Sequence, residues 1–97
     1  MREVGRVEQT VGSGAGSVFT YPAAERDTCV RAFVAARSPV RVKMEDDAKN
    51  ASVESADGAA GIVPEAGPFC VRKGSVVRLV VTSPNANFVR VIVLASP

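Results

Sequence analysis

Two valine-rich runs near the C-terminal end constrain the fold of this chain more than any other feature. Residues 75–82 and 88–95 consist mainly of valine and other apolar residues, and a stretch rich in turn formers, residues 83–87, separates them. Valine and isoleucine are stiff at χ1 and fit a pleated, half-buried surface better than a helix. The pattern predicts a β-hairpin whose loop is centred on Asn85.

The two faces of this predicted hairpin differ in polarity. One face is entirely apolar, with Val77, Leu79 and Val81 expected opposite Val93, Val91 and Val89. Such a face belongs in a core. The other face is only half apolar and includes Arg78, Val80, Phe88, Arg90 and Ile92. Either other segments of this chain cover that face or another protein chain does. These five residues are therefore the candidate protein interface.

Composition extends the strand prediction to the whole chain. Valine far outnumbers leucine and isoleucine, and eight glycines and six prolines are spread along the 97 residues. A chain of this length forms one domain with a modest core. Turn signals recur at intervals of about 8–12 residues, which predicts an all-β fold. We expect a small antiparallel β-sandwich or jelly-roll-like barrel of about seven to nine short strands.

The first 16 residues differ from the rest of the chain. Residues 3–11 alternate as a weak strand with a poor apolar face, and residues 12–17 contain only glycine, serine and alanine. Such runs behave as flexible connectors. This one lacks the Gly-Lys-Ser/Thr ending of a phosphate-binding loop. We expect residues 1–16 to form a flexible N-terminal arm with a Gly/Ser hinge, or else an edge strand, and residues 17–97 to form a single β domain.

A second hairpin is predicted in residues 28–45. A strand over residues 28–37, a turn at Ser38-Pro39 and a strand over residues 40–45 fit the alternation of apolar and polar residues. Residues 23–37 also carry a helical stripe, so a helix stays an alternative there. Four basic residues share the predicted outer face: Arg31, Arg37, Arg41 and Lys43. They fit a solvated face with local ion pairs, a salt-bridging protein surface or a polyanion site.

Charge and residue types exclude several classes of function. The net charge of +2 is too balanced to indicate nucleic-acid binding. Histidine, the usual general base and zinc ligand, is absent. The N-terminal residues carry charges where a signal peptide needs an apolar run, and no apolar stretch is long enough for a transmembrane helix. We predict no catalytic, cofactor-binding or metal-binding residue, and neither a nucleic-acid nor a membrane partner.

The cysteines and the acidic cluster leave alternatives open. Cys29 and Cys70 match no metal-binding or redox spacing. Both lie in expected strands, so two buried thiols, a disulfide or a reactive thiol are all compatible with the sequence. Glu45, Asp46 and Asp47 form either a solvated loop or part of a Ca²⁺ site.

These observations favour a non-enzymatic structural or binding protein. In size and composition the chain resembles the small β-sandwich proteins that decorate the heads of tailed phages. The resemblance implies a subunit of a larger assembly, such as a virion decoration (cement) or capsid-associated protein. Its partners would be proteins, in a homo-oligomer or a capsid lattice, and its location the virion or the cytoplasm. The alternative is an adhesion or polymer-binding β-sandwich module of a larger surface protein.

Overall fold

The computed structural model describes residues 1–23, 25–46 and 52–96, with the side chains of residue 15 and residues 52–59 left out. Seven strands make up most of these residues, and no helix occurs in them. The strands are β1 (Arg2–Val11), β2 (Gly14–Pro22), β3 (Thr28–Asp46), β4 (Ser52–Val63), β5 (Phe69–Val71), β6 (Val76–Ser83) and β7 (Asn87–Ser96). The all-β prediction is confirmed.

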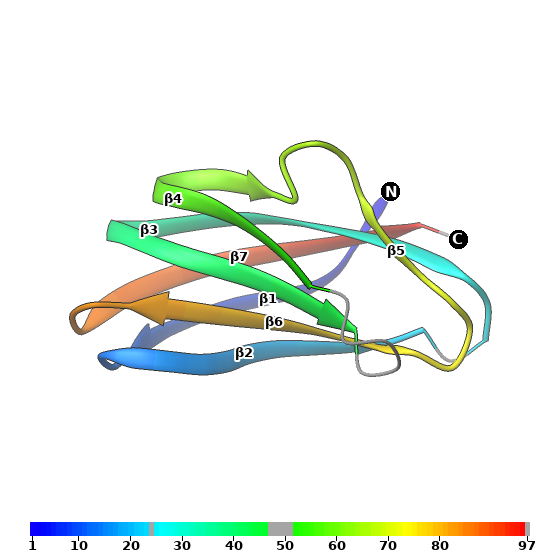
Figure 1. The fold of residues 1–97 in the computed structure, drawn as a ribbon, viewed down its shortest axis with the longest axis horizontal. Helices are drawn as coiled ribbons and strands as arrows, with labels where there is room; N and C mark the ends of the chain where they lie inside the picture. The colour runs from blue at the N-terminus through cyan, green and yellow to red at the C-terminus, as the bar shows by residue number, and fades with distance from the viewer. Residues whose placement is uncertain (24, 47–51, 97) are drawn as a thin grey trace.

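All seven strands belong to one antiparallel sheet that curls into a half-barrel (Figure 1). The strand order is β1-β7-β3-β6-β2, and β4 and β5 also pair with β3. The long strand β3 is therefore the centre of the sheet. β1 and β2 are its two ends, and they follow one another along the chain through Gly12 and Ser13.

The C-terminal strands exist as predicted, but their pairing as a hairpin is wrong. β6 and β7 diverge after residues 84–86, and neither is the hydrogen-bonded neighbour of the other. β7 pairs with the first half of β3, and β6 pairs with its second half. Each strand instead has two other ladder neighbours, β1 and β3 for β7 and β2 and β3 for β6, so neither has an edge left for the other. The inward face was predicted correctly, since all six of its apolar side chains are buried: Val77, Leu79, Val81, Val89, Val91 and Val93.

The second predicted hairpin is wrong in its pairing, because residues 28–46 form one continuous strand whose two halves pair with β7 and β6 and not with each other. The strand bends back between these two ladders, where the turn at Ser38-Pro39 was predicted (Figure 1). Even-numbered residues point inward both before and after Ser38-Pro39, as Val34 and Val40 show. Pro39 fits because it lies where β3 passes from β7 to β6. The ladder to β7 ends at Ala36, and the ladder to β6 begins at Arg41. A proline lacks the N–H that a ladder requires, so this crossing tolerates it.

A buried asparagine holds β3 at this crossing. Arg37 donates its backbone N–H to Asn87 Oδ1 over 3.1 Å, and Asn87 Nδ2 donates to the carbonyl and hydroxyl oxygens of Ser38 over 3.0 Å each. Asn87 is only 4% exposed. Its side chain replaces ladder hydrogen bonds that β3 cannot make at this point. The carboxamide of β7 thereby fixes the path of β3.

The N-terminal segment is an edge strand of the sheet. β1 pairs with β7 from Arg2 to Val11, with one bulge between Glu3 and Gly5. Val11 is buried in the core. The mobility expected for residues 1–16 stays a prediction, now about a segment that lies in the ladder. Within the described residues, no helix has the length and hydropathy needed to cross a bilayer.

Candidate protein-interaction surface

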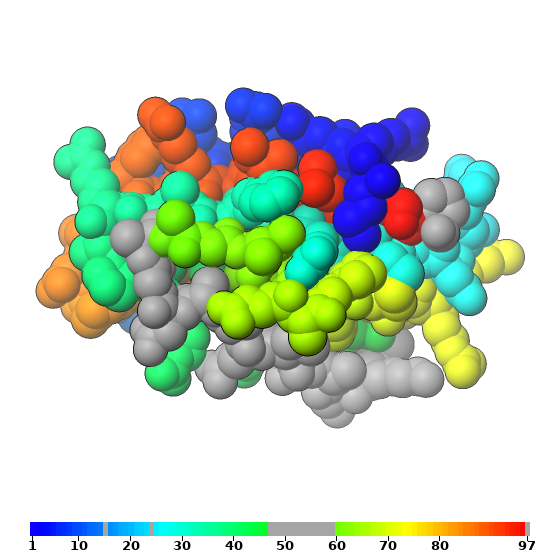
Figure 2. Space-filling view, turned by 90° about the horizontal axis from the view of Figure 1, so that it is seen from above, coloured from blue at the N-terminus to red at the C-terminus, as the bar shows by residue number. Residues whose placement is uncertain are grey.

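An apolar groove lies on the outer face of the sheet, over β3, the end of β4 and β7. Its main lining residues are Phe33, Ala35, Ile62, Arg90 and Ile92, and its volume is about 520 Å³. We call it the outer groove. Figure 2 shows this face, with β1 (blue), β7 (red to orange), β3 (teal) and the end of β4 (yellow-green) as successive bands.

Phe33 is the residue that makes this groove unusual. The residue is 47% exposed, and among the described residues only Met1 is another large hydrophobic residue with comparable exposure. Phe33 lies opposite Ile92 in the ladder between β3 and β7. Strand alternation puts Phe33 on the outer face, because Val34 points into the core. Phe33 was not among the site residues predicted from the sequence, because its pairing with Ile92 depends on the true strand order.

An aromatic ring with two cations borders the outer groove. The guanidinium carbons of Arg37 and Arg90 lie 6.0 Å and 5.9 Å from the centroid of the Phe88 ring. At this distance the ring face attracts a cation. The neighbouring strand adds a carboxylate, because Arg90 Nε lies 3.9 Å from Glu8 Oε1 on β1. The edge of the groove therefore combines apolar surface with charges of both signs.

The structure divides the five residues predicted as an interface into two groups. Phe88, Arg90 and Ile92 lie together along the outer face of β7. Arg78 and Val80 lie on β6, which is separated from β7 in the strand order by β3. Arg78 is opposite Glu45 of β3 rather than opposite β7. The prediction that all five form an interface is not tested by this arrangement, but they do not form one patch.

A second charged pair lies on the outer face of β1. Arg6 donates to both carboxylate oxygens of Glu3, over 3.2 Å and 2.9 Å. These hydrogen bonds hold the pKa of the Glu3 carboxyl below its usual value. The same contact raises the pKa of the Arg6 guanidinium. Both groups are fully exposed, so the pair is a surface feature that other charges can compete with.

The basic residues of β3 share its outer face but serve different contacts. Arg31 donates to the backbone oxygens of Pro64 and Glu65 over 3.0 Å and 2.8 Å, which ties the segment after β4 to the sheet. Lys43 Nζ lies 3.7 Å from Glu45 Oε1. The local ion pairs expected from the sequence are present for Lys43.

The acidic cluster does not converge on one point. Glu45 lies on the outer face of β3 and Asp46 is buried on the inner face, while Asp47 lies outside the described residues. No three acidic or cysteine side chains in the described chain are grouped closely enough to hold a metal ion.

The two cysteines form a disulfide. Cys29 of β3 and Cys70 of β5 are direct partners in the ladder, and their sulfur atoms are bonded. Of the alternatives left open by the sequence, the structure therefore selects the disulfide. Disulfides persist outside reducing compartments, including virion and cell surfaces.

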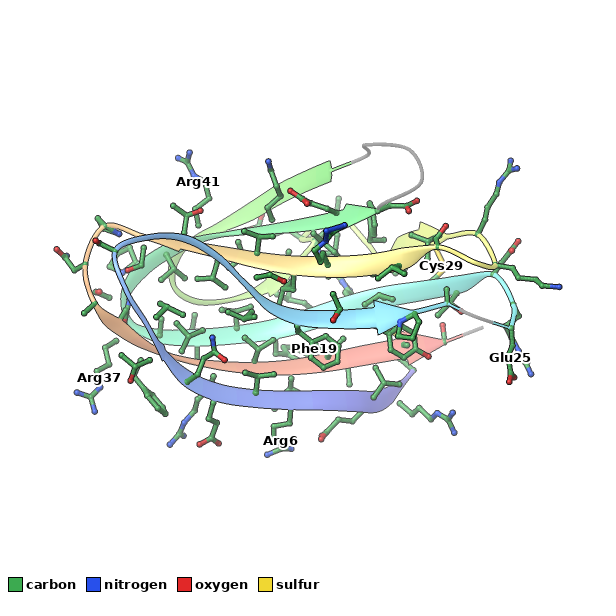
Figure 3. The ribbon with its side chains drawn as sticks, turned by 90° about the horizontal axis from the view of Figure 1, so that it is seen from below. Arg6, Phe19, Glu25, Cys29, Arg37 and Arg41 are labelled. Atoms are coloured by element: carbon green, nitrogen blue, oxygen red, sulfur yellow. A yellow bond between two sulfur atoms is a disulfide. The ribbon has the colours of Figure 1, made fainter. Side chains whose placement is uncertain are left out.

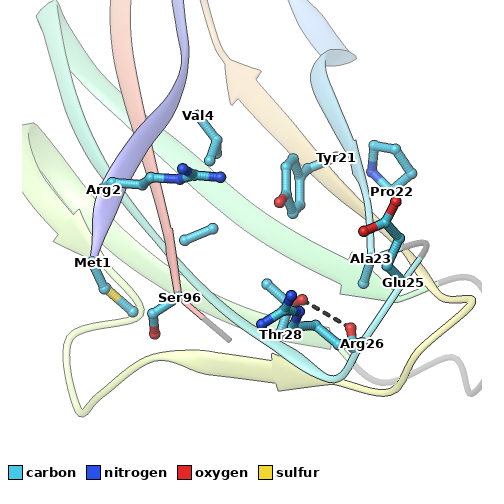
Figure 4. Close-up of a pocket in the computed structure, with 11 residues that line it drawn as sticks. Met1, Arg2, Val4, Tyr21, Pro22, Ala23, Glu25, Arg26, Thr28 and Ser96 are labelled. Carbon is cyan, nitrogen blue, oxygen red and sulfur yellow. Dashed lines mark hydrogen bonds between the residues drawn. The ribbon is translucent and has the colours of Figure 1, made fainter.

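A cavity of about 770 Å³ lies at one end of the half-barrel, between the start of β1 and the end of β2 (Figure 4). Its charged lining residues are Arg2, Glu25 and Arg26, and Tyr21 and Thr28 add hydroxyl groups. The Thr28 hydroxyl donates to the Arg26 carbonyl over 2.9 Å. This lining contains one carboxylate, that of Glu25, and no second acid, thiol or imidazole.

Comparisons with known proteins find no family model that matches the chain and no curated protein with significant similarity.

Proposed function

We propose that this chain is a non-enzymatic structural protein that acts as a subunit of a larger assembly, such as a virion decoration or capsid-associated protein. The outer groove is its contact with protein partners, in a homo-oligomer or a capsid lattice. A location in the virion or the cytoplasm belongs to this proposal, as does the absence of enzymatic activity.

The exposure of Phe33 in an apolar groove carries the proposal. A single exposed hydrophobic residue is ordinary, but here Phe33 adjoins Ile62 and Ile92 in a concave surface. An aromatic anchor with aliphatic neighbours and an arginine at the rim is the composition typical of protein interfaces. Of the two proposed locations, the disulfide favours the surface of a particle over the reducing cytoplasm.

The sandwich or jelly-roll architecture expected from the sequence is part of the same proposal. The divergence of β6 and β7 after a shared loop supports it, since both then pair with the bent strand β3. The bend lets one continuous sheet cover two sides of the core.

The absolute mass in solution tests the function. Light scattering over a roughly tenfold concentration range is expected to give an oligomer for the wild type. Phe33→Ser and Arg90→Glu are expected to form smaller species, because they remove the anchor and reverse the rim charge. Leu94→Ser and Arg72→Glu are the matched controls, since both residues lie outside the groove. A monomer at all concentrations contradicts the homo-oligomer, and equal masses for all variants contradict the groove as its contact.

The alternative function is an adhesion or polymer-binding module of a larger surface protein. The disulfide favours it, because exported domains commonly carry such bonds. The exposed ring of Phe33 is then a platform for a sugar ring. Retention of the wild type on insoluble cellulose or chitin, lost in Phe33→Ser, would support this alternative.

A further inference from the structure

The outer edge of β1 presents backbone groups that another strand can pair with. β1 pairs with β7 on one side, and no strand of the described chain pairs with its other side. A free edge offers a row of N–H and C=O groups as a template. The bulge of β1 lies near its start, so residues 5–11 form an uninterrupted edge. The edge of β2 is less suitable, because its bulge lies in mid-strand and Pro22 ends it.

The side chains along β1 match a second copy of the same strand. Arg6 and Glu8 both project from the outer face, with side-chain exposures of 57% and 50%. Figure 3 shows Arg6 pointing away from the interior of the half-barrel. In an antiparallel pair with a two-fold axis at Val7, Arg6 of each copy lies opposite Glu8 of the other. Opposite charges facing each other across two strands stabilise the pair.

Neighbouring registers do not have this complementarity. A shift of two residues in one direction puts Arg6 opposite Arg6, and a shift in the other direction puts Glu8 opposite Glu8. Like charges directly opposite each other destabilise a strand pair. A shift of one residue moves side chains to the wrong face of the sheet. The charges therefore specify one register and one partner strand.

We propose that two copies of this chain associate through β1, antiparallel and with Val7 opposite Val7. This inference rests on the proposed function for the expectation of a protein partner, and it identifies that partner and a contact distinct from the outer groove. Glu8 then lies between Arg90 of its own chain and Arg6 of the second copy. The contact of Arg6 with Glu3 is exposed and weak, so it does not prevent this exchange.

The dimer also places the outer grooves of its two copies on the same face. Because Arg6 lies opposite Ile92 in the ladder of β1 and β7, the joined sheets form a continuous outer face from β3 of one copy to β3 of the other. Both grooves open on this face. A two-fold pair of grooves is a suitable unit for a lattice.

Charge exchange tests the register. Arg6→Glu and Glu8→Arg each place two like-charged pairs in the dimer, and we expect each to raise its dissociation constant at least about tenfold. In an equimolar mixture, Arg6→Glu pairs with Glu8→Arg so that every opposed pair is again complementary. We expect this heterodimer to regain an affinity close to that of the wild type. Arg72→Glu is the control for net charge.

Light scattering measures the dissociation constant. Amide exchange of β1 is compared at protein concentrations at which the dimer is populated and at which it is dissociated. A wild type that is monomeric throughout, or single variants and mixtures with unchanged dissociation constants, would overturn the inference. Phe33→Ser separates it from the proposed function. If only the inference fails, Phe33→Ser lowers the mass while the charge exchanges do nothing. If only the groove fails, the charge exchanges act while Phe33→Ser does not.

Discussion

At the scale of single residues, Asn87 links β7 to the middle of β3. Its side chain lies on β7 but makes its hydrogen bonds with the backbone and hydroxyl of residues 37 and 38 in β3. Buried polar groups are costly when they lose their partners. The position where β3 changes neighbours is therefore stabilised by one carboxamide.

Asn87→Ala is expected to lower the free energy of unfolding by about 2–4 kcal/mol, because it leaves the Arg37 N–H and the Ser38 carbonyl without their partner. Urea denaturation followed by circular dichroism measures this change. Asn85→Ala is the matched control, since Asn85 is exposed and its only hydrogen bonds to Ser83 use its backbone. Equal losses in the two variants would contradict the role of the Asn87 side chain.

At the scale of elements, β5 depends on the disulfide. It has only three residues and pairs with β3 alone. A strand this short has few ladder hydrogen bonds, so the bond between Cys29 and Cys70 is its strongest link to the sheet. The bond also closes a long loop that contains β4 and most of β3.

Replacing both cysteines by alanine is expected to lower the free energy of unfolding by about 4 kcal/mol, as chain entropy predicts for a loop of this length. Amide exchange should become faster first in residues 69–71, because local opening of β5 no longer breaks a covalent link. Reduction of the wild type with dithiothreitol should reproduce the change, and the same reductant should leave the double variant unaffected. An unchanged β5 in the reduced protein would contradict this dependence.

At the scale of the whole molecule, one side-chain contact connects β1 and β2, the two end strands of the half-barrel. β1 and β2 do not pair, and the Phe19 ring of β2 packs against Gly5 of β1 (Figure 3). A side chain at position 5 would overlap this ring. Glycine is therefore required here by close approach, and the two ends of the sheet meet through this contact.

Gly5→Ala is expected to destabilise the protein by about 1–2 kcal/mol, because the added methyl group displaces the Phe19 ring. In a Phe19→Ala background the same change should be neutral or stabilising, and the double-mutant cycle measures this coupling. Gly16→Ala is the control, since a Cβ there meets no atom within 4 Å. Additive effects of the two substitutions would show that the contact does not close the barrel.

Much of the fold was predictable from the alternation of side chains. The alternation of residues 30–44 already argues against the predicted hairpin, because a two-residue turn at Ser38-Pro39 would put Val34 on the same face as Lys43. The unbroken alternation of inward and outward side chains instead favours a single strand, and the structure shows one. For the candidate site, the sequence identified Arg90, Ile92 and Phe88 on an outer face, but it joined them to Arg78 and Val80 through a pairing that does not exist.

The sequence by itself determined that the chain is all-β, which residues form the last two strands and which of their side chains point inward. These properties are local, because strand propensity and period-two alternation depend on neighbouring residues. Only the tertiary structure decided which strands pair, that Cys29 meets Cys70, and that Phe33 lies beside Ile92. Such pairings join residues far apart in the chain. They depend on the free energies of competing ladders over the whole sheet, which no local pattern contains.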